Sequence, residues 1–252
     1  MVDRLFSEPS LAALYDLFSP WERRSDFHFY LPLIMSARAV LDVGCGTGAM
    51  LHRARESGHT GRLCGLDPAP AMLEQARKRA DIEWILGDLA GDLASVSFDR
   101  EFDLVVMTGH AFQVLVEDRD LQAALAAIRS ALTDDGCFAF ETRNPLVREW
   151  ERWTPDKFAE VTAADGAVVR MVREVQTPIQ GDLVSFTHTF TSPHWDHPQV
   201  SRSTLRFLDT NSLRSFLSDA GLEIAKQYGD WNRQALTANS PEIITLARRT
   251  KK

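Results

Sequence analysis

A short segment combines an acid with three alternating glycines, as in loops that bind a nucleoside cofactor. It reads Val40-Leu41-Asp42-Val43-Gly44-Cys45-Gly46-Thr47-Gly48, an apolar run followed by glycines that let the backbone turn tightly and approach a ligand. Gly44, Gly46 and Ala49 also match the G-x-G-x-x-G/A dinucleotide fingerprint. The Asp42 carboxylate would repel a pyrophosphate, whereas it suits the ammonium and sulfonium of S-adenosylmethionine. The loop therefore favours S-adenosylmethionine, with Asp42, Gly44, Cys45, Gly46 and Gly48 as candidate cofactor residues.

Two more acids follow apolar runs further along the chain. Asp67 is placed to accept hydrogen bonds from both ribose hydroxyls of an adenosine nucleoside. It precedes Pro68 and could also cap the start of a helix, a less favoured alternative that is compatible with the ribose role. In Gly87-Asp88-Leu89, Asp88 is placed to read an adenine amino group, although an ordinary Gly-Asp turn explains it as well. Pro68, Met72, Leu89 and Met107 complete the predicted cofactor residues.

Four side chains are candidates for the acceptor side of the site. His110 follows an apolar run and could accept a proton from an oxygen or nitrogen nucleophile, or only pack and orient the substrate. Arg143 could meet a polar or anionic substrate group, or pair with Glu141 instead. Tyr30 and Trp231 are the predicted aromatic substrate residues, because a phenol or indole offers both an apolar face and a polar atom.

The histidines of the segment 188–197 raise the question of a metal site. His194 and His197 lie in a turn between Pro193 and Pro198, and no fourth ligand is evident beside His188. We predict no metal. The tryptophans are better suited to form the walls of an acceptor pocket, which would admit an apolar or sugar-like molecule; they are Trp150, Trp153, Trp195 and Trp231.

Apolar runs alternate with helical patterns over the part of the chain that carries these residues. Strands are expected at 39–43, 62–66, 82–86, 102–107 and 137–141, and helices at 70–80 and 121–132. Such alternation predicts a parallel sheet with crossover helices. A helix at 212–220 after Thr210 as N-cap and two antiparallel strands, 222–228 and 242–247, complete the sheet. Residues 146–209 contain three further strand patterns and predict an inserted antiparallel cap.

Composition limits the class of protein and its partners. The 252 residues are 44% hydrophobic and 25% charged, which is typical of a folded globular chain. A net charge of -7 disfavours nucleic acid as a partner, because phosphate contacts need clustered Lys and Arg. Neither a signal peptide nor a membrane span is visible, and the three isolated cysteines suggest no disulfide framework. We expect a cytoplasmic protein without a membrane partner.

The order of these motifs resembles the class I S-adenosylmethionine-dependent methyltransferases. The resemblance rests on the glycine segment 42–48, on Gly65-Leu66-Asp67-Pro68, on Gly87-Asp88 and on Phe102-Asp103-Leu104-Val105-Val106-Met107. It covers residues 38 to 142 and is looser at the terminal strand pair. It implies that the glycine loop packs on the methionine moiety, that Asp67 holds the ribose and that the Asp88-Leu89 position reads adenine.

The resemblance also implies an architecture and a reaction. The expected fold is α/β, with a Rossmann-like seven-stranded sheet of order 3-2-1-4-5-7-6, its last strand antiparallel, and helices on both faces. One domain would comprise an N-terminal aromatic lid (1–36), the cofactor-binding core (37–145 and 210–252) and the cap (146–209). The expected activity is methyl transfer to O or N of a small-molecule acceptor, releasing S-adenosylhomocysteine. An NAD-type oxidoreductase and a non-catalytic S-adenosylmethionine-binding regulator stay open as alternatives, and the acceptor and the oligomeric state are undetermined.

Overall fold

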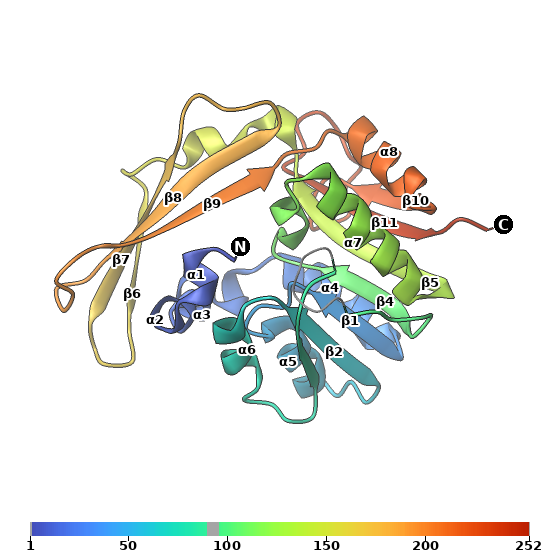
Figure 1. Cartoon of the computed structure of the whole chain (residues 1–252), viewed down its shortest axis with the longest axis horizontal. Coiled ribbons are helices and arrows are strands. Elements are labelled where there is room, and N and C mark those ends of the chain that lie inside the picture. Colours follow the sequence, from blue (N-terminus) through green and yellow to red (C-terminus); the bar gives the residue numbers. More distant parts are fainter. Residues whose placement is uncertain (1, 90–95, 252) are drawn as a thin grey trace.

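Two β-sheets organise the molecule, which the computed structural model describes over residues 2–89 and 96–251 (Figure 1). The larger sheet has seven strands in the order β3-β2-β1-β4-β5-β11-β10. Its strands are β1 (Ala39–Val43), β2 (Arg62–Asp67), β3 (Glu83–Leu86), β4 (Phe102–Met107), β5 (Leu132–Arg143), β10 (Leu222–Tyr228) and β11 (Glu242–Arg249). All pairs are parallel except those of β11, which runs antiparallel to β5 and β10. The predicted order 3-2-1-4-5-7-6 is confirmed.

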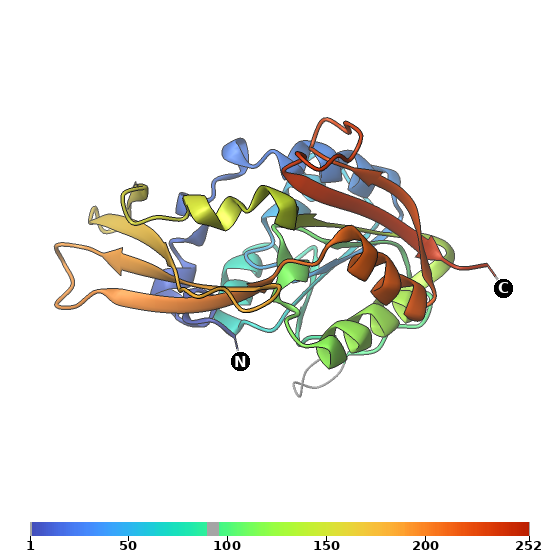
Figure 2. The same ribbon diagram turned by 90° about the horizontal axis from the view of Figure 1, so that it is seen from above.

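Helices cover both faces of this sheet because every central strand is apolar on both sides. On one face α4 (Asp26–Ser36) and α5 (Ala49–Glu56) enclose a buried cluster that includes Ile34, Leu51 and Leu63. On the other face α7 (Asp118–Ala131) and α8 (Thr210–Asp219) enclose a second cluster (Figure 2). A shorter helix, α6 (Pro70–Ala76), packs beside β2 and β3.

The insertion after β5 is a four-stranded antiparallel sheet that extends away from the core (Figure 1). Its strands are β6 (Phe158–Thr162), β7 (Val168–Val175), β8 (Leu183–Thr191) and β9 (Gln199–Arg206). The sequence predicted only three. The missed strand, β6, is a short edge strand with no fully buried residue, so its pattern lacks the apolar alternation that marked the others.

The N-terminal segment lies between the cap and the core (Figures 1 and 2). It forms three single-turn helices before α4, and short 3₁₀ turns connect other elements. These are α1 (Arg4–Ser7), α2 (Pro9–Ala12), α3 (Tyr15–Phe18), η1 (Trp21–Arg23), η2 (Ala111–Val114), η3 (Pro145–Val147) and η4 (Glu149–Arg152).

Some predicted boundaries need correction. Helix α8 begins at Thr210, and its N-cap is Asp209, whose Oδ1 accepts hydrogen bonds from the backbone N–H groups of Asn211 and Ser212 at 2.8 Å. A carboxylate caps these amides better than the predicted Thr210 hydroxyl. Strand β5 begins at Leu132, five residues before the predicted start at 137, and has an irregular register against β4.

Candidate cofactor and acceptor site

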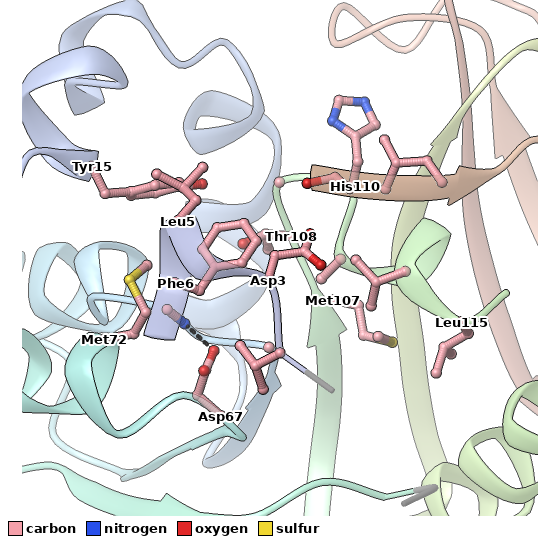
Figure 3. Close-up of a pocket in the computed structure, with 18 of the residues that line it drawn as sticks. Asp3, Leu5, Phe6, Tyr15, Asp67, Met72, Met107, Thr108, His110 and Leu115 are labelled. Atoms are coloured by element: carbon pink, nitrogen blue, oxygen red, sulfur yellow. Dashed lines mark hydrogen bonds between the residues drawn. The ribbon is translucent and has the colours of Figure 1, made fainter. Parts of the chain in front are cut away.

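One cavity of about 1240 Å³ lies at the C-terminal edge of β1, β2 and β4, enclosed by the core, the N-terminal segment and the cap. Most of the predicted cofactor residues line it, namely Gly44, Gly46, Asp67, Pro68, Met72, Asp88, Leu89 and Met107. Three of the predicted substrate residues also line it, namely His110, Arg143 and Trp231. Residues far apart in the sequence thus form one continuous wall (Figure 3).

The remaining predicted residues lie behind that wall. Asp42 and Tyr30 are fully buried, Cys45 is buried, and Gly48 begins helix α5. A Cβ on Gly48 would lie 2.3 Å from the Trp84 ring, so this glycine permits close helix–sheet packing. None of the four is among the residues that line the cavity, and their assignment as contact residues stays a prediction.

The first glycine of the loop shapes the floor of the cavity. Gly44 has a φ of +75°, and a Cβ at this position would come within 2.9 Å of the Ala111 side chain. Its N–H donates to the Leu66 carbonyl at 2.8 Å, which ties the loop to the end of β2. A larger residue would therefore close the space between the loop and the turn after β4.

The buried carboxylate of Asp42 provides a test of the predicted cofactor. Neither of its oxygens has a hydrogen-bond partner among the described residues, and burial raises its pKa from 3.8 to about 7. The nearby Arg24 guanidinium lowers that pKa in part. A cationic ligand group over the glycine loop would compensate this carboxylate, whereas a phosphate would worsen its environment. The site thus fits the methionine end of S-adenosylmethionine.

Asp67 links the cavity to the start of helix α6. Its Oδ2 accepts from the Gly46 N–H at 2.7 Å, and its Oδ1 accepts from the Ala69 N–H at 2.9 Å. Each carboxylate oxygen can accept a second hydrogen bond, so the side chain can order the loop and still bind a ribose diol. Ala69 is the N-cap residue itself, and Asp67 satisfies its amide, so the structural role is compatible with the predicted ligand role.

The N-terminal segment covers the cofactor end of the cavity. Phe6 and Tyr15 pack on each other, and both contact the cluster around Met72, above Asp67 in Figure 3. The Thr47 hydroxyl donates to Asp16 at 2.8 Å, so the glycine loop is joined directly to helix α3. A cofactor bound here would lie under this segment.

A network of buried polar groups surrounds His110. Nε2 of His110 lies 3.0 Å from Oε2 of Glu242, the first residue of β11. The backbone N–H of His110 donates to Oε1 of Glu141 at 2.7 Å, and the Tyr30 hydroxyl donates to the other oxygen of that carboxylate. His110 adopts a left-handed conformation with φ of 64°, which directs its amide to Glu141.

Burial controls the charges in this network. It lowers the pKa of His110 to about 3, aided by the nearby Arg143, and raises the pKa of Glu242 to about 8. It also raises the pKa of Glu141. The imidazole is therefore neutral near pH 7, and Glu242 is the group of this pair that gains or loses a proton near that pH.

Arg143 lies opposite Glu242 in the β5–β11 register and carries its own partners. Its guanidinium pairs with Glu149 at 2.9 Å, donates to Gln113 at 3.0 Å and stacks over the Trp153 ring. Pairing between Arg143 and Glu141 does not occur. Of the predicted aromatic walls, only Trp153 and Trp231 line the cavity.

Several cavity residues were not anticipated from the sequence. Glu242 is the acidic first residue of a largely apolar final strand, and this acid was a usable signal. Arg24 and Asp26 form a 2.5 Å ion pair in which both side chains are largely buried, and Gly109 leaves the room that this arginine occupies. Nothing in the local sequence around 24–26 distinguishes this pair from a surface pair.

The described part of the chain has neither a metal-binding cluster nor a membrane-spanning helix. Among residues 2–89 and 96–251, no group of three or more His, Cys, Asp or Glu side chains is placed to hold a metal ion. The helices of that part of the chain are too short or too polar to cross a membrane.

Comparison with known proteins adds independent evidence. A family model described as "Methyltransferase domain" matches residues 40–136. The chain is 29% identical over 225 residues to the cypemycin N-terminal methyltransferase of Streptomyces sp, covering 85% of this chain and 84% of that protein. It is 31% identical over 215 residues to the glycine/sarcosine N-methyltransferase of Parasynechococcus marenigrum (strain WH8102), covering 84% and 72%. The CcbJ methyltransferase from Streptomyces caelestis has the same fold, with a TM-score of 0.72 at 20% identity over 94% of this chain and 96% of that one.

Proposed function

Because this chain belongs to the class I S-adenosylmethionine-dependent methyltransferases, we propose that it methylates a nitrogen or oxygen atom of a small-molecule acceptor. One observation carries the proposal. A single cavity joins the glycine loop and Asp67 to the His110–Glu242 pair, under an aromatic cap. The donor and a small nucleophile can therefore meet within one cavity.

The two relatives support nitrogen as the methylated atom. The first is named an N-terminal methyltransferase and the second an N-methyltransferase. We therefore rank nitrogen before oxygen as the atom that accepts the methyl group.

The residues of the cavity would position the reactants more than activate them. The sulfonium of S-adenosylmethionine supplies the methyl group, so in-line alignment of donor and nucleophile accounts for most of the acceleration. In our proposal Asp67 holds the ribose, Asp88 and Leu89 flank the adenine, and Asp42 compensates the cofactor's positive charge. His110 would receive the proton that the nucleophile loses.

Calorimetric titration with S-adenosylhomocysteine tests the cofactor site, with NADH titrated in parallel. We expect the nucleoside to bind and NADH not to bind. Asp67→Ala should weaken the nucleoside by roughly 10- to 150-fold, because hydrogen bonds to a charged group contribute about 1.5–3 kcal/mol. Asp135→Ala, at an exposed position, is the matched control. Binding of NADH alone, or equal affinity in both variants, would contradict the assigned site.

A further inference from the structure

The cap presents an unusual pair of residues on its inner face. Strand β8 alternates so that Val184, Phe186 and Phe190 are buried, and His188 occupies the same face. In the β7–β8 register, His188 lies directly opposite Arg173, and both line the cavity. A charged residue on an otherwise apolar inner face indicates a role beyond packing.

Arg173 has no carboxylate partner among the described residues. Its Nε donates to Nε2 of His188 at 3.0 Å, and its guanidinium stacks over the rings of Trp153 at 4.8 Å and Phe186 at 5.6 Å. The neighbouring Arg143, by contrast, is paired with Glu149. The rings hold the guanidinium in place without neutralising it, and its two terminal nitrogens have no acceptor in the described part of the chain.

His188 cannot supply the missing negative charge. Because its Nε2 accepts from Arg173, its proton is on Nδ1, a buried atom without a partner in the described structure. Burial, followed by the charge of Arg173, lowers the pKa of His188 to about 3. The ring therefore stays neutral and leaves Arg173 without an ion-pair partner, and the nearby carboxylate of Glu149, which acts electrostatically on Arg173, is itself paired with Arg143.

The cap differs from the rest of the cavity wall in the charges that it contributes. Among the described residues that line the cavity, the cap supplies Arg173 and Arg202 and no carboxylate, whereas the remaining wall carries both signs, for example Arg24 and Glu242. An anionic group of a ligand would be favoured beside Arg173, which has no ion-pair partner among the described residues.

We propose that the acceptor carries an oxyanion, a carboxylate or a phosphate, which binds the guanidinium of Arg173 while the nucleophilic atom faces His110. The inference rests on the proposed function and adds the substrate class. An arginine held by aromatic rings presents its fork of N–H groups in a fixed plane, which matches a bidentate oxyanion.

The first test needs no known acceptor. The S-adenosylhomocysteine complex is titrated with acetate and, separately, with inorganic phosphate, and its melting temperature is recorded. Wild type and Arg170→Gln should be stabilised by one or both anions, and Arg173→Gln should not. Arg170 is a matched control because it lies on the same strand, is exposed and pairs with Glu160. No stabilisation of wild type, or equal stabilisation of Arg173→Gln, would overturn the proposal; the anion that acts distinguishes carboxylate from phosphate.

The second test measures methyl transfer to small amines and alcohols that differ in one further group. That group is a carboxylic acid, a phosphate ester or a neutral amide. For anionic acceptors, Arg173→Gln should raise KM by about 10- to 100-fold, and Arg173→Lys should recover part of this loss. For neutral acceptors, the KM of Arg173→Gln should stay within about threefold of the wild-type value. Equal losses on neutral and anionic acceptors would contradict anion recognition. S-adenosylhomocysteine affinity, measured on each variant, reports separately on the proposed function.

Discussion

Single residues at the floor of the cavity are arranged for a ligand more than for stability. Asp42 is buried, and both of its carboxylate oxygens lack a hydrogen-bond partner among the described residues. Buried polar groups without partners cost the folded state free energy. Their presence beside the glycine loop agrees with a cationic cofactor that compensates them when it binds.

Asp42→Asn should separate binding from stability. Burial raises the folded-state pKa of Asp42 to about 7 from 3.8, so protonated Asp42 is favoured in the fold and its ionised form is costly above about pH 7. Relative to wild type, the unliganded variant should therefore gain several degrees in melting temperature as pH rises from 5 to 8. Its affinity for S-adenosylhomocysteine should fall at least about 10-fold. A pH-independent difference in melting temperature between Asp42→Asn and wild type would show that Asp42 does not titrate in this range. Asp135→Asn, at an exposed position, is the control and should show no such pH-dependent gain.

The His110–Glu242 pair should make turnover depend on pH. Below the pKa of about 8, protonated Glu242 donates to Nε2 of His110, so the proton of the ring is on Nδ1. Above it, the carboxylate accepts from Nε2–H and leaves Nδ1 free to accept a proton. We expect kcat/KM to rise through about pH 8 in wild type, and this rise to be absent in Glu242→Gln.

His110→Gln tests the proton acceptor itself. Turnover should fall by about 10²–10⁴, while cofactor affinity stays within a few-fold, because the side chain would act on the nucleophile. Steady-state kinetics and a parallel S-adenosylhomocysteine titration measure the two effects. Turnover within a few-fold of wild type would exclude His110 from this role.

Among the elements, the N-terminal segment has the most direct relation to cofactor access. Its helices α1 to α3 pack on the cap through Leu5, Leu14 and Phe190 and on the core through Met72. Such single-turn helices have little stability of their own, so their position depends on these contacts. We propose that the segment covers the cofactor, because its contacts with the cap and the core are separate from the central sheet and can open while the sheet stays folded.

Asp16→Ala should therefore speed cofactor release. The variant loses the 2.8 Å hydrogen bond from Thr47 that joins α3 to the glycine loop. A hydrogen bond to a charged group contributes about 1.5–3 kcal/mol, so dissociation of S-adenosylhomocysteine should be about 10-fold or more faster. Stopped-flow fluorescence measures this rate. Ser10→Ala, which removes a contact internal to the same segment, should leave it unchanged, and equal rates in all three proteins would mean that the segment does not retain the ligand.

The whole molecule encloses its cavity with three separate parts of the chain. The core supplies Asp67 and Glu242, the N-terminal segment lies over the Asp67 end, and the cap supplies Trp153 and Arg173. The N-terminal segment contacts the cap through one cluster of side chains and the core through another, so a ligand that touches all three parts should stabilise them together.

Saturating S-adenosylhomocysteine should accordingly raise the melting temperature of the whole chain. At a ligand concentration of about 100 times Kd, binding adds about 2.7 kcal/mol, or roughly 5–10 °C for a protein of this size. Calorimetry should show one cooperative transition with ligand. A shift confined to part of the transition would show that the cap unfolds independently. Asp67→Ala, with its roughly 10- to 150-fold weaker binding, should retain only about 0.3–1.4 kcal/mol of this stabilisation at the same ligand concentration.

The core and its cofactor motif could be predicted because their signals are local. The segment 40–48, the acids Asp67 and Asp88 after their strands, and the alternation of strands and helices depend on neighbouring residues, and the fold rules permit few topologies for them. The predicted strand order and cofactor class are confirmed on that basis.

Other features were decided only by tertiary packing. His110 meets Glu242 across 132 positions of sequence, and Tyr30 meets Glu141 across 111. Arg173 opposes His188 only because the β7–β8 register places them together. No neighbouring residue encodes such contacts, since they depend on crossover connections, strand register and the burial that shifts each pKa. The cofactor class was therefore determined by the sequence alone, whereas the charge and shape of the acceptor site emerged only from the folded arrangement.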